Sequence, residues 1–304
     1  MKKKDGFSHK LSSWLDRDNV AGYVFILPFI IGLIVFTTIP FFTSLYLAFT
    51  NYNILSAPKW VGLDNFKKMF FEDDLFWTSF KVTFKFALIQ VPIKLTVALL
   101  VALVLSRSTR LTSFYRAAFY IPSLMGGSVA IALLWKQLFS PRGVLNQVLG
   151  FFGLPDRTAW LGNPKTALGT LIALGVWQFG SCMLIFLSGL KQIPNSLYES
   201  AAIDGASPMK QFWKITMPML TPTIFFNMVQ QIITSFRVFT ESYVITNGGP
   251  MDSTLTYVLY LYRSAFTNFH MGYSCALAWI LVVIIGIATA ILFKSQDAWV
   301  HYEG

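Results

Sequence analysis

The chain carries one patterned polar stretch, residues 191–218, which reads KQIPNSLYESAAIDGASPMKQFWKITMP. Two long apolar segments flank it, so we expect it to form a loop at one face of a membrane. Ser196 and Glu199 have the spacing of a capping box, in which the serine accepts from the Glu199 amide and the Glu199 side chain reaches back to the serine amide. This motif predicts a short helix that runs from there to Asp204.

The middle of the stretch predicts a second short helix, separated from the first by a turn. Gly205 suits the left-handed position that ends a helix. Ser207 is a typical N-cap, and Pro208 stands at the first helical position, where no amide hydrogen is missed. The second helix carries large apolar side chains at helical spacing: Met209, Phe212, Trp213 and Met217. An amphipathic loop that lies on the lipid surface is the alternative interpretation, with Glu199 acting only as a cap.

Composition indicates a membrane protein. The 304 residues are 55% hydrophobic and only 12% charged, and the mean hydropathy is +0.56, values that exclude an ordinary soluble domain. The net charge of +10 does not point to nucleic acid, because no soluble basic domain exists to carry it. Basic residues in short loops beside an anionic inner leaflet explain it better. Cys182 and Cys275 lie in apolar segments without disulfide or metal spacing, which indicates packing roles.

Six apolar segments are long enough to cross a bilayer, at about residues 20–49, 76–105, 117–138, 167–190, 219–245 and 272–293. The first run is roughly twice as long as a signal-peptide core, so we expect an uncleaved span. With the N-terminus inside, the inner segments hold twelve Lys and Arg and the outer segments seven. This predicts an all-α polytopic membrane protein with six transmembrane helices and both termini cytoplasmic. The expected parts are a cytoplasmic segment 1–19, a transmembrane domain 20–293 that contains the cytoplasmic loop 191–218, and a cytoplasmic tail 294–304.

The 191–218 loop resembles the cytoplasmic EAA motif of permease subunits in ATP-binding-cassette (ABC) importers. The motif stands here as Glu199-Ser200-Ala201, then Gly205, then Ile215-Thr216-Met217-Pro218, with the family's spacing. Serine for alanine and methionine for leucine are departures that keep small and apolar character. The resemblance implies that the loop docks in a groove on an ATP-hydrolysing subunit. The positions it implies for this contact are Glu199, Ser200, Ala201, Asp204, Gly205, Ala206, Phe212, Ile215 and Pro218.

The resemblance extends over nearly the whole chain, from about residue 22 to residue 293. The segments WVGLDNF at 60–66, TNGGP at 246–250 and YRSAF at 262–266 resemble permeases for sugars and glycerol-3-phosphate, in the form without the large extra outer domain of the maltose permease. The resemblance implies a type I importer in the bacterial cell membrane. Its implied partners are a second, different permease subunit, two ATP-hydrolysing subunits, an extracellular solute-binding protein and a sugar, with an oligosaccharide preferred.

The sequence gives no sign of enzyme chemistry. It has no G-x-x-x-x-G-K-[ST] loop to hold a nucleotide and no catalytic Ser/His/Asp or Cys/His set. We therefore expect no cofactor or metal in this chain, and ATP with Mg on the partner ATPase. The alternative class is a sugar transporter driven by an ion gradient, for which Glu241, near an outer end, is the one suitable embedded acid. A nutrient receptor is a third reading, but the sequence shows no output domain.

Polar side chains inside the apolar segments mark a candidate translocation path. The 219–245 segment carries a polar stripe, which must face protein or water instead of lipid. Lys81 and Lys85 can snorkel to an outer interface, whereas Lys94 lies deeper and needs a partner or a water-filled cavity. The candidate residues are Lys94, Trp177, Gln178, Asn227, Gln230, Gln231, Thr234, Ser235, Arg237 and Glu241.

Amides and hydroxyls in this set are expected to hydrogen-bond sugar hydroxyls, and Trp177 is expected to stack on a sugar ring or to pack. Arg237 and Glu241 are four residues apart, so an ion pair between them is the alternative to a substrate role. Alternatively, Arg237 binds a carboxylate of the substrate, which would suit a uronate-containing oligosaccharide. Phe236 and Tyr243 are likewise expected to stack on a sugar ring or to pack.

Overall fold

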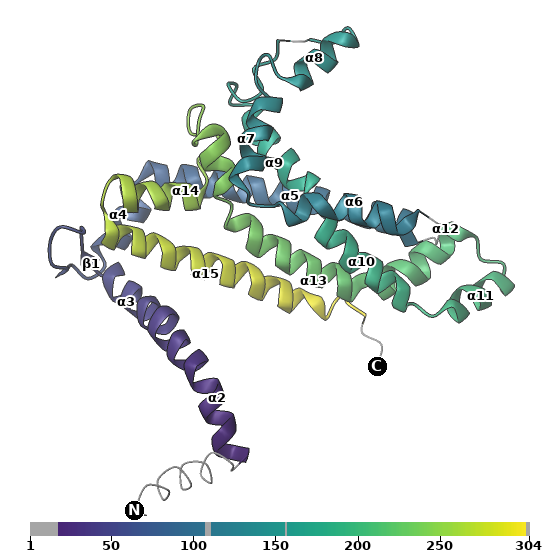
Figure 1. The fold of residues 1–304 in the computed structure, drawn as a ribbon, viewed down its shortest axis with the longest axis horizontal. Helices are drawn as coiled ribbons and strands as arrows, with labels where there is room; N and C mark the ends of the chain where they lie inside the picture. The colour runs from purple at the N-terminus through teal and green to yellow at the C-terminus, as the bar shows by residue number, and fades with distance from the viewer. Residues whose placement is uncertain (1–17, 107–110, 156, 302–304) are drawn as a thin grey trace, which may run out of the picture.

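In the computed structural model the chain folds as a set of helices with one two-stranded hairpin in the part that the structure describes, residues 18–106, 111–155 and 157–301 (Figure 1). Most of the predicted N-terminal segment 1–19 lies outside the described residues. So do the last three residues of the predicted tail 294–304, and Arg107 and Arg110, which contributed to the predicted orientation.

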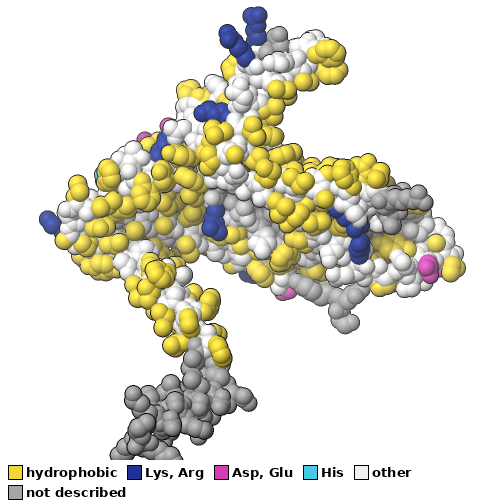
Figure 2. Space-filling view, viewed as in Figure 1, with side chains coloured by type: hydrophobic (Ala, Val, Ile, Leu, Met, Phe, Trp, Pro, Cys, Tyr) yellow, Lys and Arg dark blue, Asp and Glu magenta, His cyan; other side chains and the backbone are white. Residues whose placement is uncertain are grey.

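The first predicted span is confirmed as a long apolar helical segment. It consists of α2 (Asp18–Leu33), a π-helical turn η1 (Ile34–Thr38) and α3 (Ile39–Ala48), with Phe25–Ala48 apolar enough to cross a membrane. α3 packs against α15 (Met271–Gln296), where the rings of Phe41 and Trp279 lie 4.7 Å apart. α2 extends away from the other helices (Figure 1), and hydrophobic side chains cover it and most of the face shown in Figure 2. Such an apolar surface is typical of a segment in lipid.

α5 (Asp74–Ser106) is the helix around which the others assemble. The Asp73 carboxylate caps its start, because Oδ1 accepts from the amides of Leu75 and Phe76 at 3.0 and 3.1 Å. Before it come the antiparallel strands β1 (Thr50–Asn51) and β2 (Lys59–Trp60) and the short helix α4 (Asp64–Phe71). α5 contacts the helices α9, α10, α13 and α14, whose bounds follow.

Two predicted spans are not continuous helices, which corrects the sequence-based expectation. In the 117–138 segment, α6 (Thr112–Leu124) and α7 (Val129–Leu138) meet at 99°. In the 167–190 segment, α9 (Ala167–Trp177) and α10 (Gly180–Gln192) meet at 43°. The first break falls at Gly126-Gly127, where Gly127 has φ +72° and leaves the helical region.

The remaining elements are α8 (Val144–Phe151), α11 (Asn195–Ile203), α12 (Pro208–Gln211), η2 (Phe212–Thr216), α13 (Met217–Phe236), η3 (Ser242–Thr246), α14 (Tyr257–Tyr262) and η4 (Arg263–Thr267). By length and composition three described helices could cross a membrane, or up to five elements if each bent pair is one span. α13, in the predicted 219–245 span, is not among them, and its polar stripe lowers its hydropathy. The count of six spans stays a prediction.

Candidate functional site

The 191–218 loop forms two short helices at one end of the molecule, α11 and α12 (Figure 1). Gly205 has φ +73°. The Ala206 amide donates to the Ala201 carbonyl at 2.9 Å, and the Gly205 amide donates to the Ala202 carbonyl at 3.0 Å. These two bonds make a Schellman motif, which satisfies carbonyls at the end of α11. The predicted glycine turn is therefore confirmed.

The predicted capping box is wrong. α11 begins at Asn195, so its N-cap is Pro194, and no side-chain hydrogen bond caps it. The reason is that Pro194 takes extended backbone angles, φ −62° and ψ 131°, and starts the helix directly after itself. Ser196 therefore lies inside the first turn, where it no longer occupies the capping position.

The second helix starts as the sequence predicts. The Ser207 side chain accepts from the Lys210 amide at 3.4 Å, and Pro208 occupies the first turn. A hydrogen bond of 2.8 Å between the Tyr198 hydroxyl and Thr216 Oγ1 ties the first helix to the segment after the second. The loop is therefore one preformed unit.

The residues predicted for ATPase contact divide by exposure into two groups. The exposed group is Glu199, Ser200, Asp204 and Gly205, and the partly buried group is Ala201, Ala206, Phe212, Ile215 and Pro218. Large apolar side chains are exposed beside them, above all Ile203 at 87% and Met209 at 67%. A soluble surface rarely presents such side chains together at one tip, so this end has the character of a contact surface.

A polar cavity of about 410 Å³ lies where three helix breaks converge. The α6–α7 break contributes Gly126 and Gly127, the α9–α10 break contributes Gln178, and the end of α13 contributes Arg237. Its polar lining consists of Gln90, Lys94, Ser123, Gln178, Ser181, Gln231, Thr234, Ser235, Arg237, Thr240 and Glu241. We call this space the central cavity. Seven of the ten predicted path residues line it.

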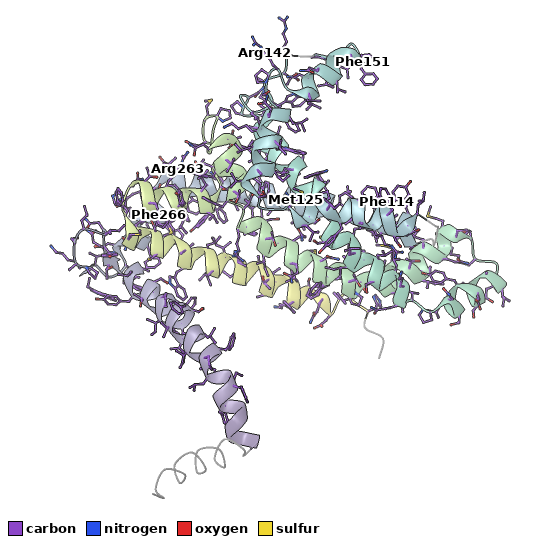
Figure 3. All side chains as sticks on the ribbon, in the orientation of Figure 1. Phe114, Met125, Arg142, Phe151, Arg263 and Phe266 are labelled. Atoms are coloured by element: carbon purple, nitrogen blue, oxygen red, sulfur yellow. The ribbon has the colours of Figure 1, made fainter. Side chains whose placement is uncertain are left out.

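Hydrogen bonds of Ser123, at the end of α6, join the α6–α7 break to the α9–α10 break. Its Oγ donates to the Gln178 carbonyl at 3.0 Å and accepts from the Ser181 amide at 3.1 Å. A Cβ on Gly180 would lie 2.3 Å from the Phe119 carbonyl oxygen, so only glycine permits this approach of α6 and α10. In Figure 3 the labelled Met125 marks the junction of α6 and α7.

A second contact joins α5, α9 and α13 at the cavity wall. The Ser235 hydroxyl donates to Gln90 Oε1 at 3.0 Å. A Cβ on Gly175 would lie 1.8 Å from Gln90 Nε2, so the glycine makes room for the glutamine side chain. Both Gln90 and Ser235 are buried, and their hydrogen bond satisfies polar groups that would otherwise be costly there.

The ionisable residues of the cavity are Lys94, Arg237 and Glu241. Lys94 is buried, with 7% of its surface exposed. The sequence indicated that this lysine needs a partner or a cavity, and the lysine lines the central cavity. No ion pair joins Arg237 to Glu241 among the described residues. The reason is that α13 ends at Phe236 and Arg237 is its C-cap, with φ −100° and ψ 11°, so the two side chains do not share one helix face. The predicted alternative of an internal pair is therefore wrong.

Three predicted path residues do not line the cavity. Gln230 is exposed, one turn of α13 before the lining residue Thr234. Trp177 packs on Trp135 with ring centroids 5.7 Å apart, in a separate apolar hollow. Asn227 is 1% exposed, and neither amide atom has a hydrogen-bond partner among the described residues. Of the two other predicted aromatics, Phe236 is buried in the core and Tyr243 lines a different pocket.

An apolar cluster packs beside the central cavity. On α10 and α13 its members lie between the cavity-lining residues and the 191–218 loop. Its members include Val91, Leu95, Ala98, Cys182, Met183, Phe186, Leu187, Ile224 and Met228. Asn227 belongs to the same stretch of α13 as the last two.

The sequence did not predict Ser123, Ser181, Thr240 or the paired glycines as cavity residues. Gly126-Gly127 after Pro122 is the one signal available for the first break, because adjacent glycines and a proline interrupt an apolar run. No comparable signal marks Ser181 or Thr240, which reach the cavity only through the bends.

Comparison with known proteins extends the picture. Residues 94–302 match the family described as "Binding-protein-dependent transport system inner membrane component". The "Probable ABC transporter permease protein YesP" of Bacillus subtilis (strain 168) is 52% identical over 97% of this chain and 96% of that protein. The "Arabinooligosaccharides transport system permease protein AraP" of the same organism is 30% identical over 95% of this chain and 94% of that protein.

Among solved structures, the fold resembles a chain from the "Crystal structure of bacterial alginate ABC transporter in complex with alginate pentasaccharide-bound periplasmic protein". The TM-score is 0.80, the identity is 24%, and the likeness covers 93% of this chain and 95% of that one. The bent helices described above thus belong to a fold already seen in a membrane assembly.

Proposed function

The chain belongs to the binding-protein-dependent transport system inner membrane component family, as a permease subunit of a carbohydrate ABC importer, and we propose that it moves an oligosaccharide through the central cavity. In this proposal the 191–218 loop docks on an ATP-hydrolysing subunit and transmits its closure to the helices. ATP and Mg²⁺ are bound by that partner. The chain itself supplies the path and the coupling surface.

The observation that carries the proposal is the convergence of three helix breaks on one polar cavity. Backbone that leaves helical geometry inside a membrane exposes polar groups, which is tolerated only where they line a cavity or meet protein. Broken helices around a central site are a recurrent way to build a solute site in transporters. Amide, hydroxyl and charged groups around about 410 Å³ suit a solute rich in hydroxyls.

The second support is the loop at the other end of α10 and α13. Both helices run from the cavity wall to the loop, α10 toward its start and α13 from its end. A force on α11 and α12 therefore acts directly on two helices that line the cavity. In this proposal the apolar cluster closes the path to the loop end in one state of alternating access.

The proposed partners follow from the family and from what relatives are named for. An importer of this class needs an extracellular solute-binding protein, two ATP-hydrolysing subunits and a second permease. The similarity to AraP favours an oligosaccharide as the solute. The alginate transporter structure, which holds a periplasmic protein, supports a solute-binding partner.

A transport measurement tests the proposal. The chain is co-expressed with the second permease and the ATP-hydrolysing subunit of its importer, purified and placed in proteoliposomes. We expect uptake of an oligosaccharide that needs ATP and the binding protein and that persists when an ionophore removes ion gradients. Uptake that an ionophore abolishes while ATP is present would support the ion-driven alternative, with Glu241 as its embedded acid.

A further inference from the structure

A second pocket lies beside α14 and η4, outside the central cavity. It encloses about 520 Å³, and its lining includes Tyr243, Asn247, Tyr260, Tyr262, Arg263 and Asn268. We call it the α14 pocket. Figure 3 labels Arg263 and Phe266 there, well separated from the arm that carries Arg142 and Phe151. Neither the family description nor the relatives' names assign a role to this pocket.

Aromatic rings connect the two spaces. Phe239 lines the central cavity, and Tyr243 lines the α14 pocket. Their rings stack with centroids 5.3 Å apart and planes 11° apart. Tyr243 contacts Tyr262 at 5.5 Å, and Tyr262 contacts Phe266 at 5.1 Å. We call these four residues the aromatic ladder.

The ladder has the chemistry of a carbohydrate track. The C–H face of a sugar ring packs on an aromatic face, while tyrosine hydroxyls and asparagine amides at the edge hydrogen-bond its hydroxyls. Tyr243 and Phe266 are exposed, at 42% and 57%. These two rings are therefore not enclosed in an apolar core, and their faces are accessible.

The α14 pocket has a positive charge that the structure orients. Arg263 Nη2 donates to the Asn247 carbonyl at 2.6 Å and to Asn247 Oδ1 at 3.2 Å. An anchored guanidinium is a preorganised partner for a carboxylate, to which its remaining N–H groups can donate a charge-assisted hydrogen bond. No carboxylate is among the lining residues.

One carboxylate, that of Asp73, is hydrogen-bonded to a residue that lines this pocket, and it is engaged by other groups. Asp73 accepts from the hydroxyls of Tyr260 and Tyr273 and from two amides at the start of α5. Burial, together with the hydrogen bond to Asp73, raises the pKa of Tyr260, so this hydroxyl stays protonated and keeps donating. The Asp73 carboxylate is thereby engaged by other groups, and the Arg263 guanidinium stays available to a ligand.

The central cavity has the same bias. Two cationic side chains line it, Lys94 and Arg237, against the single carboxylate of Glu241. Both ends of the ladder are therefore net positive. A neutral sugar needs hydrogen-bonding groups but gains nothing from either excess charge, whereas a buried lysine such as Lys94 carries a desolvation cost.

We propose that the α14 pocket is an outer subsite for a uronate-containing oligosaccharide, which passes along the aromatic ladder to the central cavity. In it Arg263 binds a uronate carboxylate while Tyr243 and Tyr262 stack on the sugar rings. Lys94 and Arg237 then receive the carboxylates at the inner end. The inference rests on the proposed function, because it names the class of sugar and its route.

Uptake of a defined mixture tests this inference. The complete importer in proteoliposomes, supplied with ATP and its binding protein, is offered oligogalacturonates and oligomannuronates together with neutral galacto-, arabino- and gluco-oligosaccharides. Internalised species are measured by mass spectrometry. We expect the wild type to take up acidic species, and Arg263→Gln to lower their initial uptake rate at limiting concentration on the order of tenfold. Any neutral species carried should change less than twofold.

Two further variants separate charge from structure. Arg142→Gln removes an exposed arginine of the α7–α8 arm and should leave acidic uptake unchanged. Asn268→Asp leaves the bonds of Arg263 to Asn247 in place and adds a negative charge to the pocket. It should lower acidic uptake even where Arg263→Gln fails to fold.

Each outcome decides between the claims. Uptake of neutral species alone, or equal loss of acidic and neutral uptake in Asn268→Asp, would overturn the acidic subsite and leave the importer intact. Unchanged acidic uptake in both Arg263→Gln and Asn268→Asp would also overturn it. ATP-independent uptake by the wild type, or no uptake at all, would overturn the proposed function instead.

Discussion

Replacement of Gly205 by alanine or valine perturbs the 191–218 loop at a single backbone position. Gly205 has φ +73°, and a Cβ built there meets no atom within 4 Å. The change is therefore free of steric clash, and its cost is that of a left-handed conformation for a residue with a Cβ. That cost is about 1–2 kcal/mol for alanine and more for a β-branched residue.

The structure translates this cost into a coupling defect. The loop is exposed at the end of the molecule, so the strain shifts the turn out of its docking geometry without touching the bundle. At 1.4 kcal/mol for each factor of ten, about 1–2 kcal/mol lowers the equilibrium constant for the docking geometry about 5- to 30-fold. We expect Gly205→Ala to reduce the ATP hydrolysis stimulated by loaded binding protein by up to this factor, and Gly205→Val to reduce it further.

Gly153 provides a matched control. It has φ +71° with no atom within 4 Å of a built Cβ, and it ends α8 with the same two hydrogen bonds, from Leu154 to Leu149 and from Gly153 to Gly150. Gly153→Ala thus carries the same backbone cost on the outer arm. Equal loss of stimulated ATP hydrolysis in the two alanine variants, or normal coupling in Gly205→Val, would refute the docking role of the loop.

Three further perturbations have defined outcomes. Tyr198→Phe removes the 2.8 Å bond that ties the loop together and should weaken stimulated ATP hydrolysis by a factor that matches about 0.5–1.5 kcal/mol; an unchanged rate would count against a preformed loop. Gly175→Ala should displace Gln90, whose Nε2 lies 1.8 Å from the built Cβ, and lower uptake several-fold while the subunits still co-purify; loss of co-purification would mean a folding defect. Asn227→Leu removes two unpaired buried amide atoms and should raise the melting temperature of the purified complex, by stabilising this conformation about 1–3 kcal/mol; a lower melting temperature would mean that the amide is satisfied in the assembly.

The backbone preferences of single residues made the conformation of the 191–218 loop predictable from the sequence. A glycine that needs φ > 0 and a serine before a proline each act within one helical turn, so Gly205 and Ser207 occupy the positions that the sequence indicates. The capping box failed for an equally local reason. Pro194 supplies a backbone start one residue earlier, and the Ser196 hydroxyl then lies in the wrong turn.

The central cavity was only partly predictable. Polar residues in apolar runs identified seven of its lining side chains, including Lys94 and Gln178, because burial in lipid leaves such groups few alternatives. Its shape depends on bends between segments that read as continuous spans. The predicted ion pair of Arg237 and Glu241 assumed that one helix carries both residues. The helix instead ends at Phe236, one residue before Arg237. Contacts between distant helices, such as Gln90 with Ser235, carry no sequence signal in one chain.

Contact between the 191–218 loop and an ATP-hydrolysing subunit is the central claim, and site-specific photo-cross-linking in the native membrane measures it most directly. A benzophenone side chain replaces Ile203, which is 87% exposed on the loop, or Phe151, which is 86% exposed on the arm of α8. We predict that the probe in place of Ile203 captures an ATPase subunit and that the probe in place of Phe151 does not. Capture of lipid alone in place of Ile203, or of the ATPase in place of Phe151, would contradict the account.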